Sequence, residues 1–167
     1  MKKFILFTGI MCIALTSTVN AQESKLISFA ERFMQTFKGH EDDFSVVRIS
    51  PQMLSMISKM SDEKSVENEF LKKLKGLYIL SYDMGNRKII QNFDQQMKTL
   101  LKDYESLMEI KDGKDKVQML TKMEGGKITD FVMLVNSLEG FTFINFFGEI
   151  DLSNLSKLQT LSKAFTK

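Results

Sequence analysis

Four apolar runs separated by three short turns occupy the stretch from Tyr104 to Ile150, and they constrain the fold more than any other part of the chain. Two of the turns contain Asp112-Gly113 and Gly125-Gly126, and glycine readily adopts the positive φ that tight hairpins need. The third turn lies at residues 136–140. The stretch therefore predicts a four-stranded antiparallel meander.

The first long run of this meander alternates in character, which predicts the two faces of the strand. One face carries Val117, Met119, Thr121 and Met123, and the other carries Lys116, Gln118, Leu120 and Lys122. Because a half-buried antiparallel strand alternates in this way, we expect the polar set to face water and the sheet to be covered on the opposite side there.

The next two runs are apolar on both faces. Residues 131–135 read Phe-Val-Met-Leu-Val, which predicts a central strand whose second face is also covered. The last run places Phe141, Phe143 and Phe147 on one face and Thr142, Ile144 and Phe146 on the other. These phenylalanines are typical of a protein core, and an apolar ligand pocket is the alternative interpretation.

The N-terminal residues 1–21 have the layout of a secretory signal peptide. Lys2 and Lys3 precede an apolar run from Phe4 to Leu15, and the small residue Ala21 predicts cleavage before Gln22. The run is too short to span a bilayer about 30 Å thick. The only cysteine, Cys12, follows Met11 rather than a small residue, so we expect no lipid anchor and a mature chain without disulfides.

Removal of the signal peptide changes the charge balance of the chain. The 23 basic and 21 acidic residues become 21 of each, because only Lys2 and Lys3 are lost. A net charge of zero argues against a generally basic protein that binds nucleic acid or a membrane surface. Residues 22–167 are long enough for one domain with a proper core, and no second domain is evident.

Helical periodicity appears in four segments outside the meander, and two further strands lie between them. Together these elements predict an α+β fold with an antiparallel or mixed sheet of about six strands and helices mainly on one face. Ser50 and Pro51 predict the start of the second helix, whose expected buried stripe includes Met53 and Met60. The expected helices lie at residues 24–38, 51–60, 61–74, 90–104 and 151–165, where the third continues the second after a restart. The expected strands lie at residues 44–49 and 77–82.

Several segments resemble an exported family from Bacteroidetes that is known only as domain of unknown function 4252. The resemblance covers most of the mature chain and rests on the signal peptide and on residues 46–53, 76–80, 104–108, 131–135 and 148–155. It implies an envelope location and no known activity. Some relatives carry a lipoprotein cysteine, which this chain lacks at the corresponding place. The family provides no catalytic, cofactor or metal residues to assign here.

Catalytic motifs are nearly absent from the sequence. His40 is the only histidine, and it lies beside Glu41, Asp42 and Asp43 in a polar segment. We interpret this segment as a solvated loop, and a metal or acid–base site is the less favoured interpretation. Gly125-Gly126 lacks the residues of a phosphate-binding loop. Lys72, Lys73 and Lys75 are typical of a solvated helix face, and the ten methionines of the mature chain fit a core better than a copper site.

Three hypotheses about function remain, and the first is preferred. In this hypothesis the protein is periplasmic or secreted and has no catalytic activity. It binds another envelope protein or regulates the envelope. The second is a carrier of an apolar ligand such as a lipid. The third is a hydrolase built on the carboxylates Glu105, Glu109, Asp130 or Glu149, which requires two of them to meet in one cleft.

We predict that the mature protein begins at Gln22, because the junction after Ala21 has the small residue that signal peptidase requires. N-terminal sequencing and intact mass of the protein recovered from its host check this prediction. Retention of Met1, or a lipid on Cys12, would contradict it.

Overall fold

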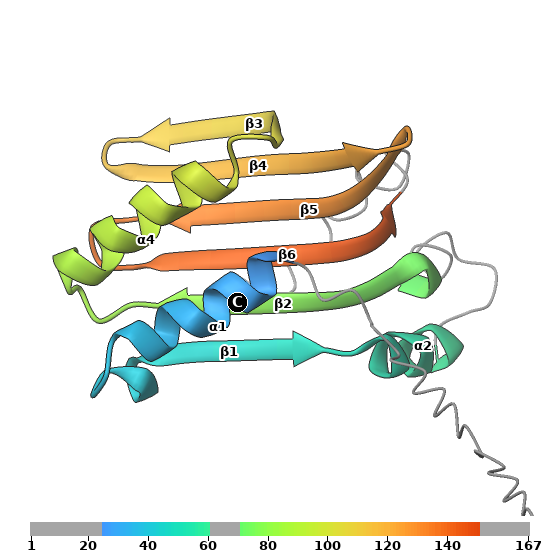
Figure 1. Ribbon diagram of the computed structural model, residues 1–167, viewed down its shortest axis with the longest axis horizontal. Helices are drawn as coiled ribbons and strands as arrows, with labels where there is room; N and C mark the ends of the chain where they lie inside the picture. Colours follow the sequence, from blue (N-terminus) through green and yellow to red (C-terminus); the bar gives the residue numbers. More distant parts are fainter. Residues whose placement is uncertain (1–24, 61–70, 151–167) are drawn as a thin grey trace, which may run out of the picture.

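A computed structural model describes residues 25–60 and 71–150 of the chain. They form one six-stranded sheet with two long helices on one face and a shorter helix at one end (Figure 1). The elements are α1 Lys25–Thr36, η1 Glu41–Asp43, β1 Phe44–Ile49, α2 Pro51–Met60, β2 Leu74–Tyr82, α4 Arg87–Leu100, β3 Glu105–Asp112, β4 Asp115–Glu124, β5 Lys127–Asn136 and β6 Phe141–Ile150.

All five strand pairings of the sheet are antiparallel, in the order β1-β2-β6-β5-β4-β3. The predicted α+β class and the predicted meander of the last four strands are therefore confirmed. The chain inserts β2 beside β6, which places β1 at one edge of the sheet and β3 at the other.

Aromatic side chains hold the two long helices on the sheet. Phe93 of α4 stacks on Phe141 of β6 with ring centroids 3.7 Å apart and an angle of 2° between the ring planes. Phe33 of α1 contacts both of these rings edge-on. Tyr82 of β2 and Phe44 of β1 extend the cluster to the edge of the sheet. Such ring pairs contribute roughly 0.5–1.5 kcal/mol each beyond the burial of their area.

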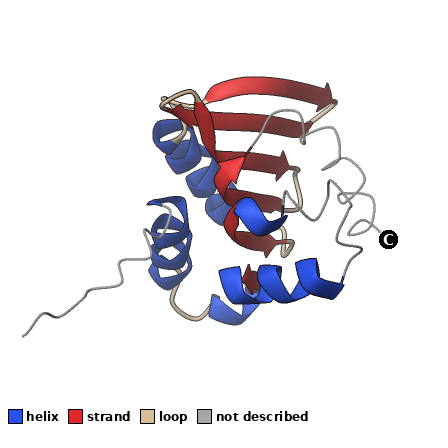
Figure 2. Ribbon diagram, turned by 90° about the vertical axis from the view of Figure 1, so that its right-hand side faces the viewer, coloured by secondary structure: helices blue, strands red, loops and turns tan. Residues whose placement is uncertain are grey.

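The two long helices lie on one side of the sheet (Figure 2). A smaller cluster lies on the other face, towards the end where α2 is found. Leu54 of α2 contributes to it, together with Phe131, Phe146 and Ile128 from the meander. The prediction that the strand at 131–135 has two apolar faces is confirmed, because Phe131 belongs to this cluster while Val132 and Leu134 belong to the helix-side core.

The start of α2 follows the capping chemistry that the sequence predicts. The Ser50 hydroxyl accepts a hydrogen bond from the Met53 N–H at 3.2 Å, and Pro51 occupies the first helical position of α2. The Asn86 side chain caps α4 by accepting from the Lys88 N–H at 3.1 Å. Gly39 has a φ of 82° in the turn that follows α1.

Three expectations about the elements are wrong. Leu74 begins β2 rather than ending a helix. Met53 and Met60 of α2 are exposed, and the buried side chains of α2 are Leu54 and Ser58. One wet face is expected for β4, whereas the structure partly covers both: Leu120 is buried on the side of α4, and Thr121 is buried on the opposite face.

Other predicted segments lie outside the described residues. These are the signal peptide at residues 1–21, most of the helix expected at 61–74, and the helix expected at 151–165.

We predict that Phe131→Ala destabilises the fold by about 3–5 kcal/mol, the usual cost of emptying a buried aromatic site. The side chain is 5% exposed and lies edge-on to Phe146. Chemical denaturation measures the change in the free energy of unfolding. Val47→Ala, at an exposed position, is the control, and equal losses in the two variants would contradict the packing described here.

Candidate functional site

The two edges of the sheet differ in how their backbones are protected. Unpaired edge strands attract other strands, and proteins usually blunt them with charges, prolines or bulges. β3 carries Glu105, Glu109, Lys111 and Asp112, and its pairing with β4 is interrupted between Ser106 and Met108. The charged side chains and the register shift together make β3 a poor template for a further strand.

The carboxylate of Glu109 on β3 takes part in several ion pairs and hydrogen bonds. Its carboxylate pairs with Lys111 at 2.7 Å and Lys116 at 3.1 Å, and it accepts a hydrogen bond from Gln118 at 2.9 Å. The hydrogen bond from Lys111, followed by that from Lys116, lowers the pKa of Glu109. The edge therefore presents a fixed set of charges.

β1 has fewer of these protective features, since Arg48 is its single charged residue. All six of its residues pair with β2 in an uninterrupted register, and it contains no proline or lysine. Val46 and Val47 point to opposite faces, and each is 44% exposed. We call the outer side of Phe44–Ile49 the β1 edge. Nothing else in the described part of the chain pairs with it.

The single charged residue of β1 is directed onto the helix-covered face. Arg48 forms an ion pair with Glu31 of α1, and its guanidinium lies 5.6 Å from the centre of the Tyr78 ring. Phe44 is the only fully buried side chain of the strand. The strand is thus anchored at its first residue, and its middle residues lie open to solvent.

Different surfaces flank the two ends of the β1 edge. The acidic turn Glu41–Asp43 precedes the strand, and Glu41 and Asp42 are exposed. α2 follows the strand, with an exposed row of methionines opposite Leu54 and Ser58. Met60 at the end of this row is 86% exposed. Methionine side chains adapt easily to different apolar partners.

The acidic turn also contains the only histidine. His40 Nδ1 lies 2.7 Å from Asp43 Oδ2, and Glu41 accepts a hydrogen bond from the Gly39 N–H at 2.6 Å. Within residues 25–60 and 71–150, no three histidine, cysteine or acidic side chains are grouped as metal ligands. The observed contacts order the turn itself, as expected for a solvated loop.

Of the four candidate carboxylates, only Glu149 lines the hollow beside the β4–β5 hairpin. Glu109 and Glu149 lie on β3 and β6, with two strands between them, which is roughly 14 Å at normal strand spacing. Glu105 lies opposite Thr121 and Asp130 opposite Lys122, so these two carboxylates lie on opposite faces of the sheet. The paired-carboxylate hypothesis gains no support from this arrangement.

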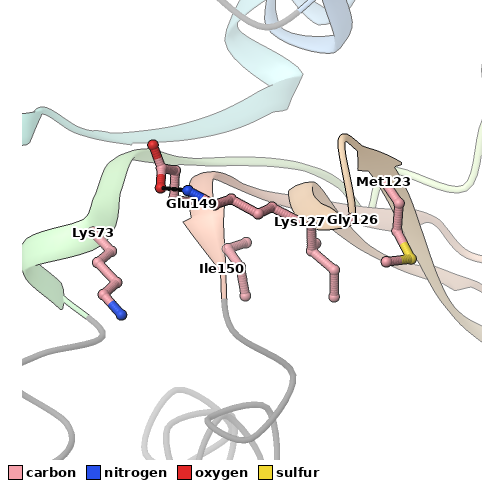
Figure 3. A pocket seen from close by; sticks show the side chains of 7 residues that line it. Lys73, Met123, Gly126, Lys127, Glu149 and Ile150 are labelled. Atoms are coloured by element: carbon pink, nitrogen blue, oxygen red, sulfur yellow. Dashed lines mark hydrogen bonds and ion pairs between the residues drawn. The ribbon is translucent and has the colours of Figure 1, made fainter.

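A small hollow lies beside the β4–β5 hairpin (Figure 3), with a volume of about 270 Å³. Met123, Ile128 and Ile150 form its apolar part, and Lys73 lies at its rim. Lys127 Nζ binds Glu149 Oε2 at 2.7 Å across the top of the hollow, which lowers the pKa of Glu149. Gly125 and Gly126, with φ values of 60° and 79°, form the predicted hairpin turn.

One buried polar residue was not singled out by the sequence analysis. Asn145 of β6 is fully buried, and its Nδ2 contacts the Asp130 carboxylate at 3.4 Å and the Phe131 carbonyl at 3.5 Å. The contacts of Asn145 join β5 to β6, which is a structural role.

Tyr104 has a raised pKa. Burial is the main cause, and the charges of Asp130 and Glu124 raise the pKa further.

The fold and these surfaces define an α+β domain with one charged, irregular sheet edge and one regular sheet edge. A family described as a domain of unknown function (DUF4252) matches residues 34–158. The match covers most of the chain, and the protein belongs to this family. Comparison with curated proteins gives no match. In the described ranges, no helix is both long enough and apolar enough to cross a membrane.

We predict that His40→Ala leaves the melting temperature and the metal content of the protein unchanged, because the side chain is exposed and pairs with Asp43 of its own turn. Thermal unfolding and elemental analysis check this prediction. Loss of a bound metal, or loss of complementation of a deletion strain by a folded His40→Ala protein, would instead place a functional site in the loop.

Proposed function

We propose that this protein is an exported, non-catalytic binding module of the cell envelope, which binds another polypeptide by adding a strand to its β1 edge. The observation that carries the proposal is the contrast between the two edges. β3 is charged and irregular, whereas β1 is regular, β-branched and open. An added strand would satisfy the backbone groups on the outer side of β1 by ladder hydrogen bonds.

The position of β1 favours binding along its whole length. α1 is tied to the strand from the helix-covered face by the Arg48–Glu31 pair, so it steadies the strand. Val46 and Val47 offer apolar contacts on both faces of an added strand. Cross-strand contacts between such residues contribute roughly 0.2–1 kcal/mol each, which adds side-chain affinity to the backbone pairing.

The hollow beside the β4–β5 hairpin is the feature that best fits the alternative, an amphiphile carrier. Its apolar part and Lys73 suit a short apolar chain with an acidic head. Its volume of about 270 Å³ lies below the range of roughly 300–1,000 Å³ that is usual for ligand pockets. The β1 edge therefore provides the better supported function.

A photo-activated cross-linker placed at single positions tests the proposal in the cells that make the protein. With p-benzoylphenylalanine in place of Val46, we expect a covalent adduct to a polypeptide after irradiation. Leu107 on the β3 edge is the matched control, because its exposed fraction of 48% is close to the 44% of Val46.

The comparison between the two positions decides the outcome. An adduct at position 46 and none at position 107 supports binding at the β1 edge. Absence of an adduct at position 46, or equal adducts at both positions, would contradict it. Far-ultraviolet circular dichroism of both purified proteins confirms that the substitutions leave the fold intact.

A further inference from the structure

We infer that the strand that joins the β1 edge is β1 of a second copy of this chain, in an antiparallel arrangement related by a two-fold axis. This inference rests on the proposed function, since it names the partner at the same edge. It follows from the charges at the ends of β1, from the alternation along the strand, and from the edges that remain after pairing.

The charges flanking β1 specify which end of a partner strand can be basic. The acidic turn Glu41–Asp43 lies at the start of the strand. Its three negative charges outnumber the single positive charge of the nearby Lys38. An antiparallel partner places its C-terminal end there. The partner strand should therefore be apolar and β-branched in the middle and basic near its C-terminal end.

β1 itself has this pattern. Its sequence Phe-Ser-Val-Val-Arg-Ile has two valines in the middle and Arg48 one residue before the end. Arg48 lies on the same face as Phe44 and Val46, because side chains of a strand alternate. Arg48 keeps its ion pair with Glu31 of its own chain. In a two-fold pair, the Arg48 end of each strand lies beside the acidic turn of the other copy, so the charges at the two ends of the strand are complementary.

The alternation also restricts the register. In antiparallel pairs the residues directly opposite each other share a face, as Phe44 and Tyr82 do in the pairing of β1 with β2. A two-fold axis normal to the sheet must then pass through one residue and not between two. With the axis at Val46, Val46 faces Val46 of the copy, and Arg48 faces Phe44 next to the acidic turn.

Pairing of this kind removes the unprotected edge from both copies at once. Two six-stranded sheets become one continuous sheet whose outer strands are the two charged β3 edges. A two-fold contact uses the same surface on both copies and closes after two chains, so it does not lead to fibres. The difference between the edges is then explained: the blunted edge stays outside the dimer and the open edge lies within it.

Cysteine cross-linking tests the register in the full-length chain, carrying Cys12→Ser so that the introduced cysteine is the only one. Val46→Cys should form a covalent dimer under mild oxidation, because the two Cα atoms face each other at about 4.5–5.5 Å. Val47→Cys is the matched control with equal exposure. In this register its two Cα atoms lie roughly 8 Å apart, beyond the reach of a disulfide.

Mass in solution provides the second measurement. Light scattering should show a dimer for the unmodified protein, a monomer for Val46→Lys and a dimer for Leu107→Lys. Asp42→Lys should weaken dimerisation by about two- to fivefold, the usual range for one exposed charge pair. Thermal unfolding of each variant shows whether it is folded. If Val46→Lys does not fold, the cross-linking of Val46→Cys still tests the inference.

The outcomes separate this inference from the proposed function. A monomer in solution together with a position-46 photo-adduct to a different polypeptide overturns the second copy and leaves strand addition standing. A monomer with no adduct at position 46 overturns both. A dimer that persists in folded Val46→Lys, or that cross-links as readily through Val47→Cys as through Val46→Cys, overturns the β1–β1 pairing.

Discussion

The stacked rings of Phe93 and Phe141 are the contact on which the arrangement of this protein depends. They join α4 to the middle of the sheet at a centroid distance of 3.7 Å, and Phe33 of α1 packs against both rings. The cluster continues through Tyr82 to Phe44, where it reaches β1. Both helices therefore cover the same face, and Phe44 is the side chain through which β1 enters this cluster.

This mode of attachment leaves β1 with two roles that compete. Phe44 contributes to the core, whereas Val46 and Val47 each remain 44% exposed and contribute less to it. A strand that served folding alone would gain solubility from lysine or proline at these positions. β1 has neither lysine nor proline, whereas β3 at the opposite edge of the sheet is heavily charged. This contrast is the physical basis for assigning the β1 edge to binding.

Much of the fold could be predicted because its signals are local. The glycine turns at 113 and 125–126 and the alternation of the last runs define the meander, and Ser50-Pro51 defines the start of α2. The insertion of β2 beside β6 is a long-range pairing with no local signal, so the strand order could not be predicted. For the same reason the sequence did not show that both faces of β4 are partly covered.

The candidate site was harder to predict than the fold. An edge is defined by what a strand does not pair with, and no residue type marks it in the sequence. The residues of β1 can be read from the sequence. They indicate a binding surface only once the structure shows that β1 is an edge strand. The methionines of α2 show the same limit, because helical spacing alone does not say whether Met53 or Leu54 faces the sheet.

Amide hydrogen exchange, measured residue by residue in β1 and β3 over a range of protein concentrations, tests the central claim most directly. If β1 is a binding edge for a second copy, the amides of Ser45–Ile49 that point away from β2 become more protected as the concentration rises, while those of Glu105–Asp112 do not change. Concentration-independent exchange throughout β1, or protection that develops along β3 instead, would contradict the account.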